Sequence, residues 1–168
     1  GTAYLEALQQ LATLQVGQGL LDDAKANAEK LAAGAQQLTE HGLHIQALKI
    51  QGVIARIQSD YDAALGYFNR AAIQAQQQQL PDAEVQIAYE IAIIYYFMGK
   101  HADAIELLKN IQPKVDQANN QLLAGKVLNI LGIVYANQSR FEESLDVMLT
   151  ALVIQKSLSN KGAQQALL

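Results

Sequence analysis

The stretch that decides the fold is GKVLNILGIVYANQSRFEESLDVMLTAL, residues 125–152. In its first half, apolar side chains recur three and four positions apart from Leu128 to Tyr135, which places them on one face of an amphipathic helix. The same spacing recurs from Leu145 to Leu152 in the second half. Polar residues at 137–140 interrupt the pattern, as in a turn. Two helices joined by so short a connection must run antiparallel.

The same helix pair recurs along the whole chain at a step of 40 residues. Small residues share one position of the repeat, at Ala12, Gly52, Ala92 and Gly132. A second shared position holds Leu21, Tyr61, His101 and Phe141. A fixed period of this length indicates stacked structural repeats. We predict one domain with repeats at 5–44, 45–84, 85–124 and 125–164, followed by the start of a truncated fifth repeat at 165–168.

Turn-forming residues keep the same period. Within the pairs they lie at 17–19, 58–60, 99–100 and 138–140, and between the pairs at 41–42, 81–82, 119–120 and 160–162. Small residues should let paired helices cross closely, with Gly52 facing Ala64 and Gly132 facing Ser144. Gly34 is expected to weaken its helix by ~1 kcal/mol relative to Ala. Pro113 falls well inside a helix, where we expect a kink or a break.

These repeats resemble the tetratricopeptide repeat (TPR), and the best matches are Leu128, Gly132, Tyr135, Phe141 and Ala151. The resemblance implies an all-α fold, a right-handed superhelical solenoid of antiparallel helix pairs. The repeats are longer than the usual ~34 residues and lack the proline that usually ends the second helix. In this they are similar to the lengthened repeats of bacterial regulatory and sensory proteins.

Composition and charge exclude several classes of function. A net charge of −4 and a pI near 5.3 argue against nucleic acid, because phosphate binding requires a clustered basic surface. The chain has no Cys and therefore no thiolate zinc site. Its longest apolar run, residues 91–99, is far shorter than the ~20 residues of a membrane helix. We predict a soluble domain without membrane insertion, with the cytoplasm favoured over the periplasm.

Residues that could carry chemistry are sparse. His41 and His44 are three apart, so a shared metal is conceivable, but no third ligand recurs at a matching spacing, and surface positions at a helix boundary are the favoured interpretation. His101 is expected to pack at the start of a helix. The sequence contains no phosphate loop, nucleophile elbow or dinucleotide fingerprint. We therefore predict no enzyme activity, no cofactor and no metal.

The resemblance implies that the first helices of the pairs line a concave groove that binds a peptide or protein segment. Carried onto this sequence, the groove residues are Lys49, Val53, Arg56, Tyr89, Ile93, Tyr96, Phe97, Lys126, Asn129 and Asn137. Packing between helix pairs explains Ile91, Ala92 and Tyr95 but not the apolar and aromatic members of the third repeat, which favours a binding surface. The alternative is a tightly curled superhelix that buries them. The Lys, Asn and Arg set with which chaperone-binding members hold a terminal carboxylate is not reproduced.

The predicted function is a non-catalytic protein- or peptide-binding scaffold, as the interaction or sensor part of a larger bacterial signalling or regulatory protein. The alternatives are a self-association module that pairs through exposed solenoid ends and, less favoured, a small-ligand sensor. Leu145, Met148, Leu152 and Ile154 should form an adhesive surface at the end of the repeats. We expect further repeats in a parent protein, and in this chain we expect pairing with a second copy or a folded-back terminus.

Overall fold

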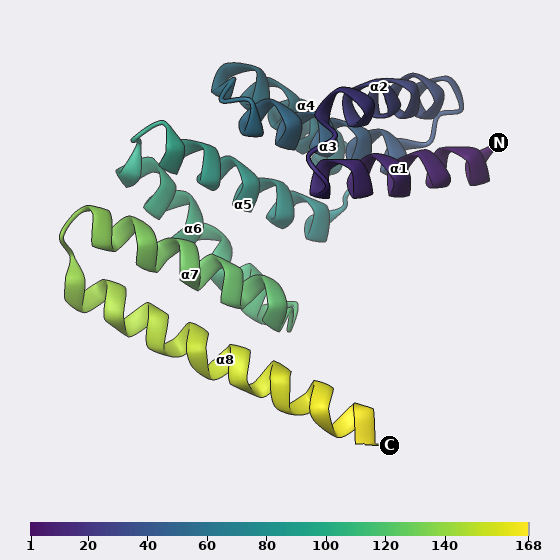
Figure 1. Cartoon of the computed structure of the whole chain (residues 1–168). Helices are drawn as coiled ribbons and strands as arrows, with labels where there is room; N and C mark the ends of the chain where they lie inside the picture. Colours follow the sequence, from purple (N-terminus) through teal and green to yellow (C-terminus); the bar gives the residue numbers. More distant parts are fainter. Residues whose placement is uncertain (168) are drawn as a thin grey trace. The chain divides into compact units, whose positions relative to one another are not determined.

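The computed structural model describes residues 1–167, with side chains described as far as Gly162. These residues form only helices, which follow one another in antiparallel pairs (Figure 1). The helices are α1 (Thr2–Gly17), α2 (Leu21–Gln37), α3 (His41–Ile57), α4 (Tyr61–Gln77), α5 (Pro81–Phe97), α6 (His101–Gln117), α7 (Gln121–Asn137) and α8 (Phe141–Leu167). The prediction of an all-α fold of paired helices is confirmed.

One kind of turn ends each of the helices α1 to α7. At the end of α3, the backbone N–H of Asp60 donates to the carbonyl oxygen of Ala55 and that of Ser59 donates to Arg56, both at 2.9 Å. These two bonds define a Schellman motif, in which the residue after the C-cap adopts a left-handed backbone. The left-handed residues are Gly19, Thr39, Ser59, Gln79, Gly99, Asn119 and Ser139.

These turns return every 20 residues, so connections within and between helix pairs are alike. The sequence had predicted turns at 41–42 and 81–82, which is wrong by about two residues. His41 and Pro81 instead begin α3 and α5. The side chains of Asp60 and Asn120 cap the helices that follow them, each accepting a hydrogen bond from a backbone N–H three residues later.

The chain divides into two compact units, Gly1–Ile87 and the residues from Ala88 onward. In the first unit, α1 packs on α2 and α3, and α3 packs on α4. Leu5 and Leu31 are buried between the first three helices. A Cβ atom added to Gly34 would lie 2.5 Å from Cδ2 of Leu5. Gly34 therefore has a packing role, because it makes room for Leu5, and is more than the weak point that the sequence suggested.

The close crossing of α3 and α4 depends on Gly52, as predicted, but its neighbour differs from the prediction. A Cβ atom at Gly52 would lie 2.6 Å from Cε2 of Phe68, a fully buried ring on α4. The sequence analysis predicted that Ala64 faces Gly52, but the side chain there is that of Phe68, one helical turn later in α4. The crossing therefore joins a glycine to a large aromatic ring.

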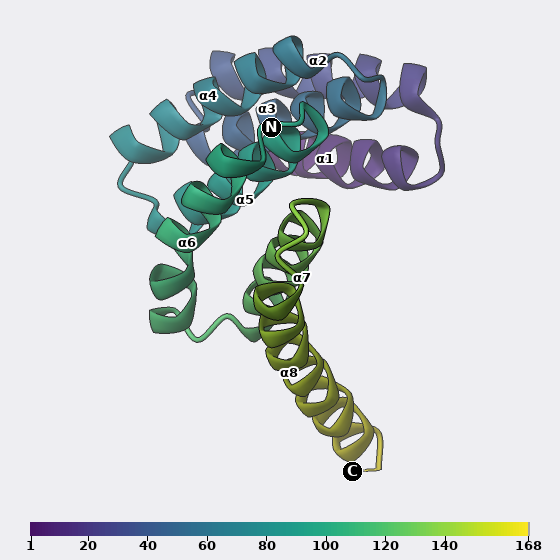
Figure 2. The ribbon, with the colours of Figure 1, turned by 90° about the vertical axis from the view of Figure 1, so that its left-hand side faces the viewer.

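In the second unit, α7 packs on both α6 and α8, and Figures 1 and 2 show α7 and α8 running antiparallel side by side. A Cβ atom at Gly132 would lie 2.6 Å from Cγ of Met148. The hydroxyl of Ser144 donates a 2.7 Å hydrogen bond to the carbonyl oxygen of Gly132. Ser144 is thus close to Gly132 as predicted, while Met148 occupies the space above it.

Helix α8 differs from its counterparts in length, since it has 27 residues where α2, α4 and α6 have 17. It continues through 160–162, so the turn predicted there is wrong. Gln155, five residues before position 160, is exposed. The equivalent residues of the other second helices are buried, namely Ala35, Ala75 and Val115. The longer helix thus coincides with an exposed residue at the position that is buried in the other second helices. Leu168, in the predicted fifth repeat, lies outside the described residues.

Pro113 lies inside α6, which remains one helix from His101 to Gln117. Of the two predicted alternatives, the break is therefore wrong, and the kink stays a prediction. Ile111 and Val115 on either side of the proline are buried, and their packing holds the two turns together although the proline removes one backbone donor.

Candidate binding surface

The predicted groove residues of the second unit lie on the first helices α5 and α7. Spacings of three and four place Tyr89, Ile93 and Tyr96 on one face of α5. The same spacing lines up Lys126, Asn129 and Asn137 along α7. The Asn137 side-chain amide lies within 3.5 Å of the Tyr96 hydroxyl, to which it donates a long hydrogen bond. The two faces therefore meet at this pair and form one surface.

Aromatic rings gather at the end of α5. The ring centroids of Tyr96 and Phe97 are 5.3 Å apart with an interplanar angle of 57°. The His101 ring, at the start of α6, lies 5.8 Å from that of Tyr96. These distances are typical of favourable tilted aromatic contacts. His101 is half-buried, so the prediction that it packs at a helix start is confirmed.

The apolar groups of α5 differ in burial according to their face. Ile87, Ile91 and Ile94 are buried in the core. Tyr89, Ile93 and Tyr96 are half-buried, and the Phe97 side chain is 49% exposed. The predicted residues of this repeat are accessible to solvent in part, as a binding surface requires, while part of each side chain already packs within the protein.

The α7 part of the surface is polar. Lys126, Asn129 and Asn137 are exposed, and Ile133 between them is half-buried. The Asn137 amide also donates a 2.8 Å hydrogen bond to the carbonyl oxygen of Ile133, which fixes the orientation of that side chain. Asn129 presents both an amide donor and an amide acceptor to solvent.

The remaining predicted residues, Lys49, Val53 and Arg56, form the equivalent stripe on α3 in the first unit. All three are half-buried. The Lys49 ammonium group donates a 3.1 Å hydrogen bond to the side-chain oxygen of Gln86. None of the ten predicted residues belongs to the buried core, and their role in binding stays a prediction.

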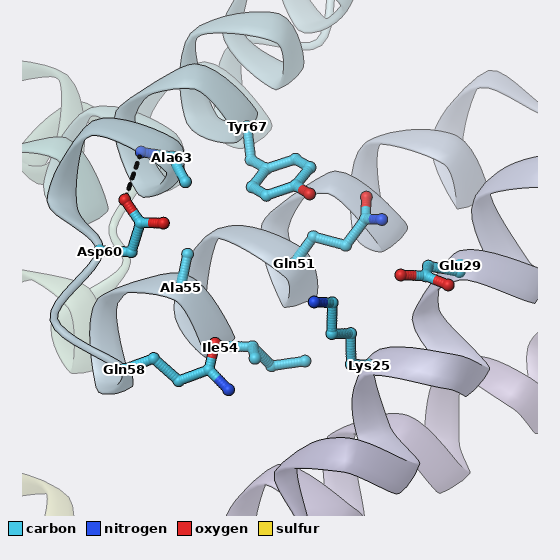
Figure 3. Close-up of a pocket in the computed structure, with 9 residues that line it drawn as sticks. All are labelled: Lys25, Glu29, Gln51, Ile54, Ala55, Gln58, Asp60, Ala63 and Tyr67. Atoms are coloured by element: carbon cyan, nitrogen blue, oxygen red, sulfur yellow. Dashed lines mark hydrogen bonds between the residues drawn. The ribbon is translucent and has the colours of Figure 1, made fainter.

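A pocket of about 100 Å³ on the first unit was not predicted from the sequence. Figure 3 shows Lys25 and Glu29 reaching toward it from α2, and Gln51 and Tyr67 bordering it from α3 and α4. Ligand pockets of proteins usually enclose about 300–1,000 Å³. This pocket is therefore too small for a typical cofactor, and its volume suits a few water molecules.

The histidines do not gather at a metal site. His41 is exposed, whereas His44 is 7% exposed, with its Nδ1 atom 2.7 Å from Nε2 of the Gln74 side chain. The prediction that both are surface residues is wrong for His44, because α4 covers it. Among the described residues, no three His, Asp or Glu side chains are grouped as a metal ion would require.

An ion pair marks the start of α8 in the second unit. The Arg140 guanidinium donates to both carboxylate oxygens of Glu143, at 2.8 and 2.7 Å. This hydrogen bonding raises the pKa of Arg140 and lowers the pKa of Glu143. The guanidinium carbon also lies 4.6 Å from the centroid of the buried Tyr135 ring. Arg140 thus ties the last turn of α7 to the first turn of α8.

Residues 10–83 match a family model described as Tetratricopeptide repeat. Over these residues the chain is similar to tetratricopeptide repeats, and its helices have a TPR-like fold. A comparison with curated proteins finds no match. In the part of the chain that the structure describes, no helix is both long enough and apolar enough to cross a membrane.

Several solved structures share the TPR-like fold. The apo form of RapI superposes with a TM-score of 0.83 at 14% identity, covering 95% of this chain and 58% of RapI. A Rap protein complexed with Competence and Sporulation Factor superposes with a TM-score of 0.84 at 13% identity, covering 92% of this chain and 44% of that protein. Aspartyl phosphate phosphatase F from Bacillus subtilis superposes with a TM-score of 0.57 at 16% identity, covering 90% of this chain and 49% of the phosphatase. This chain therefore spans about half the length of these proteins, and the likeness shows the fold alone.

Proposed function

We propose that the chain is a non-catalytic TPR scaffold that binds a peptide or protein segment on the surface formed by α5 and α7. The observation that carries this proposal is the contact between Tyr96 and Asn137, because it joins an aromatic face to an amide-bearing face. Phe97 beside it is a large apolar group that is half exposed. A mixture of aromatic anchors and adaptable amides is typical of surfaces that recognise polypeptides.

The chemistry of the surface suits an extended segment. The Asn129 amide can donate to and accept from a peptide backbone. Ile93, Tyr96 and Phe97 offer apolar contact to a side chain of the ligand, and the Lys126 ammonium offers a partner for a carboxylate. The ten predicted groove residues include no Ser or Cys nucleophile and no His, Asp or Glu that could serve as its base. This composition supports binding over catalysis.

The Rap structure solved with Competence and Sporulation Factor supports a regulatory version of this function, since that protein has the same fold. We propose that this chain is the interaction or sensor part of a larger bacterial signalling or regulatory protein, built of four 40-residue repeats. Aspartyl phosphate phosphatase F also has this fold, so the absence of catalysis is argued from the groove residues and not from the fold.

A selection from a random phage-displayed peptide library tests the proposal. The peptides recovered should bind the unmodified chain and lose at least about tenfold in affinity to Phe97→Ser or Tyr96→Ser, because truncating an interface aromatic removes ~1.4 kcal/mol or more. Asn129→Ala should give a smaller loss. The matched control is Ile73→Ser, which removes an exposed apolar side chain from α4. Peptides that bind all four variants equally would show that the α5 and α7 surface is not the site.

A further inference from the structure

The outward face of α8 in the second unit carries a stripe of exposed apolar side chains. Leu145, Leu149, Leu152 and Val153 are 61%, 54%, 45% and 68% exposed. Leu145, Leu152 and Val153 each lie three or four positions from Leu149, so the four side chains occupy one side of the helix. The opposite side of α8 packs on α7 through Ser144, Met148 and Ala151. The stripe is thus separate from the contact that holds α8 in the fold.

Leu149, at the centre of the stripe, distinguishes α8 from the other second helices. The positions equivalent to Leu149 are Glu29 in α2, Asn69 in α4 and Lys109 in α6, all polar and exposed. A leucine at a position that faces water in the other repeats has no structural purpose within this chain. An exposed row of this kind usually marks a contact surface.

Charged side chains lie at both ends of the stripe, with opposite signs. Glu142 and Lys156 are exposed and each is seven residues from Leu149, so all three share one line along α8. Leu145 and Val153 are each four residues from Leu149. Leu145 and Val153 are therefore symmetric about Leu149, and Glu142 and Lys156 are symmetric with opposite charges, whereas the position symmetric to Leu152 is the exposed Asp146.

We propose that the outward face of α8 pairs with the same face of a second copy of this chain, with the two helices antiparallel and a twofold axis passing near Leu149. In this arrangement Leu149 meets Leu149 of the second copy, and Leu145 meets Val153. At each end of the contact, Glu142 of one copy lies beside Lys156 of the other. The two ends are about 21 Å apart along the helix axis. One self-complementary contact thus pairs Leu145, Leu149 and Val153 with apolar groups and pairs both charged ends, while Leu152 lies toward Asp146 of the second copy at the edge of the contact.

Charge complementarity selects this arrangement over others. A parallel pair in register would place Glu142 beside Glu142 and Lys156 beside Lys156, and like charges in contact destabilise helix pairs. The antiparallel pair converts both repulsions into attractions. A contact confined to one helix from each copy is small, so we expect a reversible dimer with a dissociation constant on the order of micromolar.

Sedimentation velocity of the chain, from low to high micromolar concentration, tests the proposal. The unmodified chain should shift from monomer to dimer, and Leu149→Glu should remain monomeric because it places two carboxylates at the axis. Asn69→Glu, at the equivalent exposed position of α4, is the matched control and should dimerise normally. A chain that is monomeric at all concentrations would overturn the proposal.

Charge reversal tests the antiparallel geometry. Glu142→Lys and Lys156→Glu should each weaken dimerisation several-fold, because each creates two like-charge contacts. The double variant restores opposite charges and should dimerise again, and an equimolar mixture of the two single variants should form a heterodimer. Asp62→Lys, at the position of α4 equivalent to Glu142, controls for loss of an acidic residue in the first turn of a helix.

Circular dichroism of every variant shows whether the helices are retained, so that loss of association can be separated from loss of the fold. If Leu149→Glu abolishes association but the double charge variant does not restore it, the antiparallel twofold pairing is wrong. Restoration by both the double variant and the mixture would establish it, since no other partner surface responds to the two changes in this way.

Discussion

Helices α4 and α8 hold equivalent places in repeats that are 80 residues apart, yet they end differently. Helix α4 stops at Gln77 in a Schellman turn, with Ala75 fully buried just before it. Helix α8 passes the equivalent point, where Gln155 is exposed, and continues to Leu167 (Figure 1). The two helices therefore begin at the same position of the repeat, while the difference between their ends goes with a difference in burial at the residue before the turn position.

The two helices also fill the space above their glycines differently. Phe68 of α4 is a rigid, fully buried ring against Gly52. Met148 of α8 is a flexible, half-buried chain against Gly132. Methionine adapts to irregular gaps more easily than an aromatic ring. The crossing of α3 with α4 should therefore tolerate less change than the crossing of α7 with α8.

Truncating the two large side chains should have the greatest effect. Phe68→Ala should lower the free energy of unfolding by about 3–5 kcal/mol, because it removes a fully buried ring, and Met148→Ala by about 1–2 kcal/mol. Urea unfolding followed by circular dichroism measures both. At a protein concentration where the chain is monomeric, Ile73→Ala and Leu149→Ala, which truncate exposed residues of the same two helices, should stay within about 0.5 kcal/mol of the unmodified chain. Equal losses for Phe68 and Met148 would contradict the comparison.

Adding one methyl group at each glycine is a finer test. Gly52→Ala should cost about 1–3 kcal/mol, since the new Cβ meets a ring that has no room to move. Gly132→Ala should cost less than about 1 kcal/mol, since Met148 can adopt another rotamer. Gly66→Ala in α4 is the control, because nothing lies within 4 Å of its Cβ position. Because alanine has the better helix propensity, this variant should raise the free energy of unfolding by up to ~1 kcal/mol and with it the melting temperature.

Glycine substitutions in the turns that precede α4 and α8 should change stability by similar amounts. This change should be smaller than those from truncating Phe68 or adding a methyl group at Gly52. Ser59 and Ser139 have φ values of 62° and 60°, a region that costs a side-chain-bearing residue ~1–2 kcal/mol. Ser59→Gly and Ser139→Gly should each stabilise the chain by about 0.5–1 kcal/mol, part of the gain being lost to the flexibility of glycine when unfolded. Ser157→Gly within α8 should have the opposite sign in the same thermal unfolding measurement. Unequal gains would show that the two turns differ.

Part of the candidate surface could be predicted from the sequence. The spacing of Tyr89, Ile93 and Tyr96 identifies one face of a helix, and the structure leaves that face partly accessible to solvent. The sequence did not predict the tilted ring contacts of Tyr96 with Phe97 and His101, or the hydrogen bond from Asn137 to Tyr96. These contacts depend on how neighbouring helices pack and on which rotamers they select, and neither leaves a periodic signal in the sequence.

The sequence by itself determined the all-α class, the antiparallel pairs and the glycines at the crossings, because each follows from local spacing and side-chain size. Only the tertiary structure decided that Phe68 and Met148 occupy the spaces above those glycines, that α4 covers His44, and that α8 continues past 160–162. These features depend on side chains from different helices competing for the same volume. A periodic pattern specifies which face of a helix is buried, but the packed neighbour determines what fills that face and where the helix can stop.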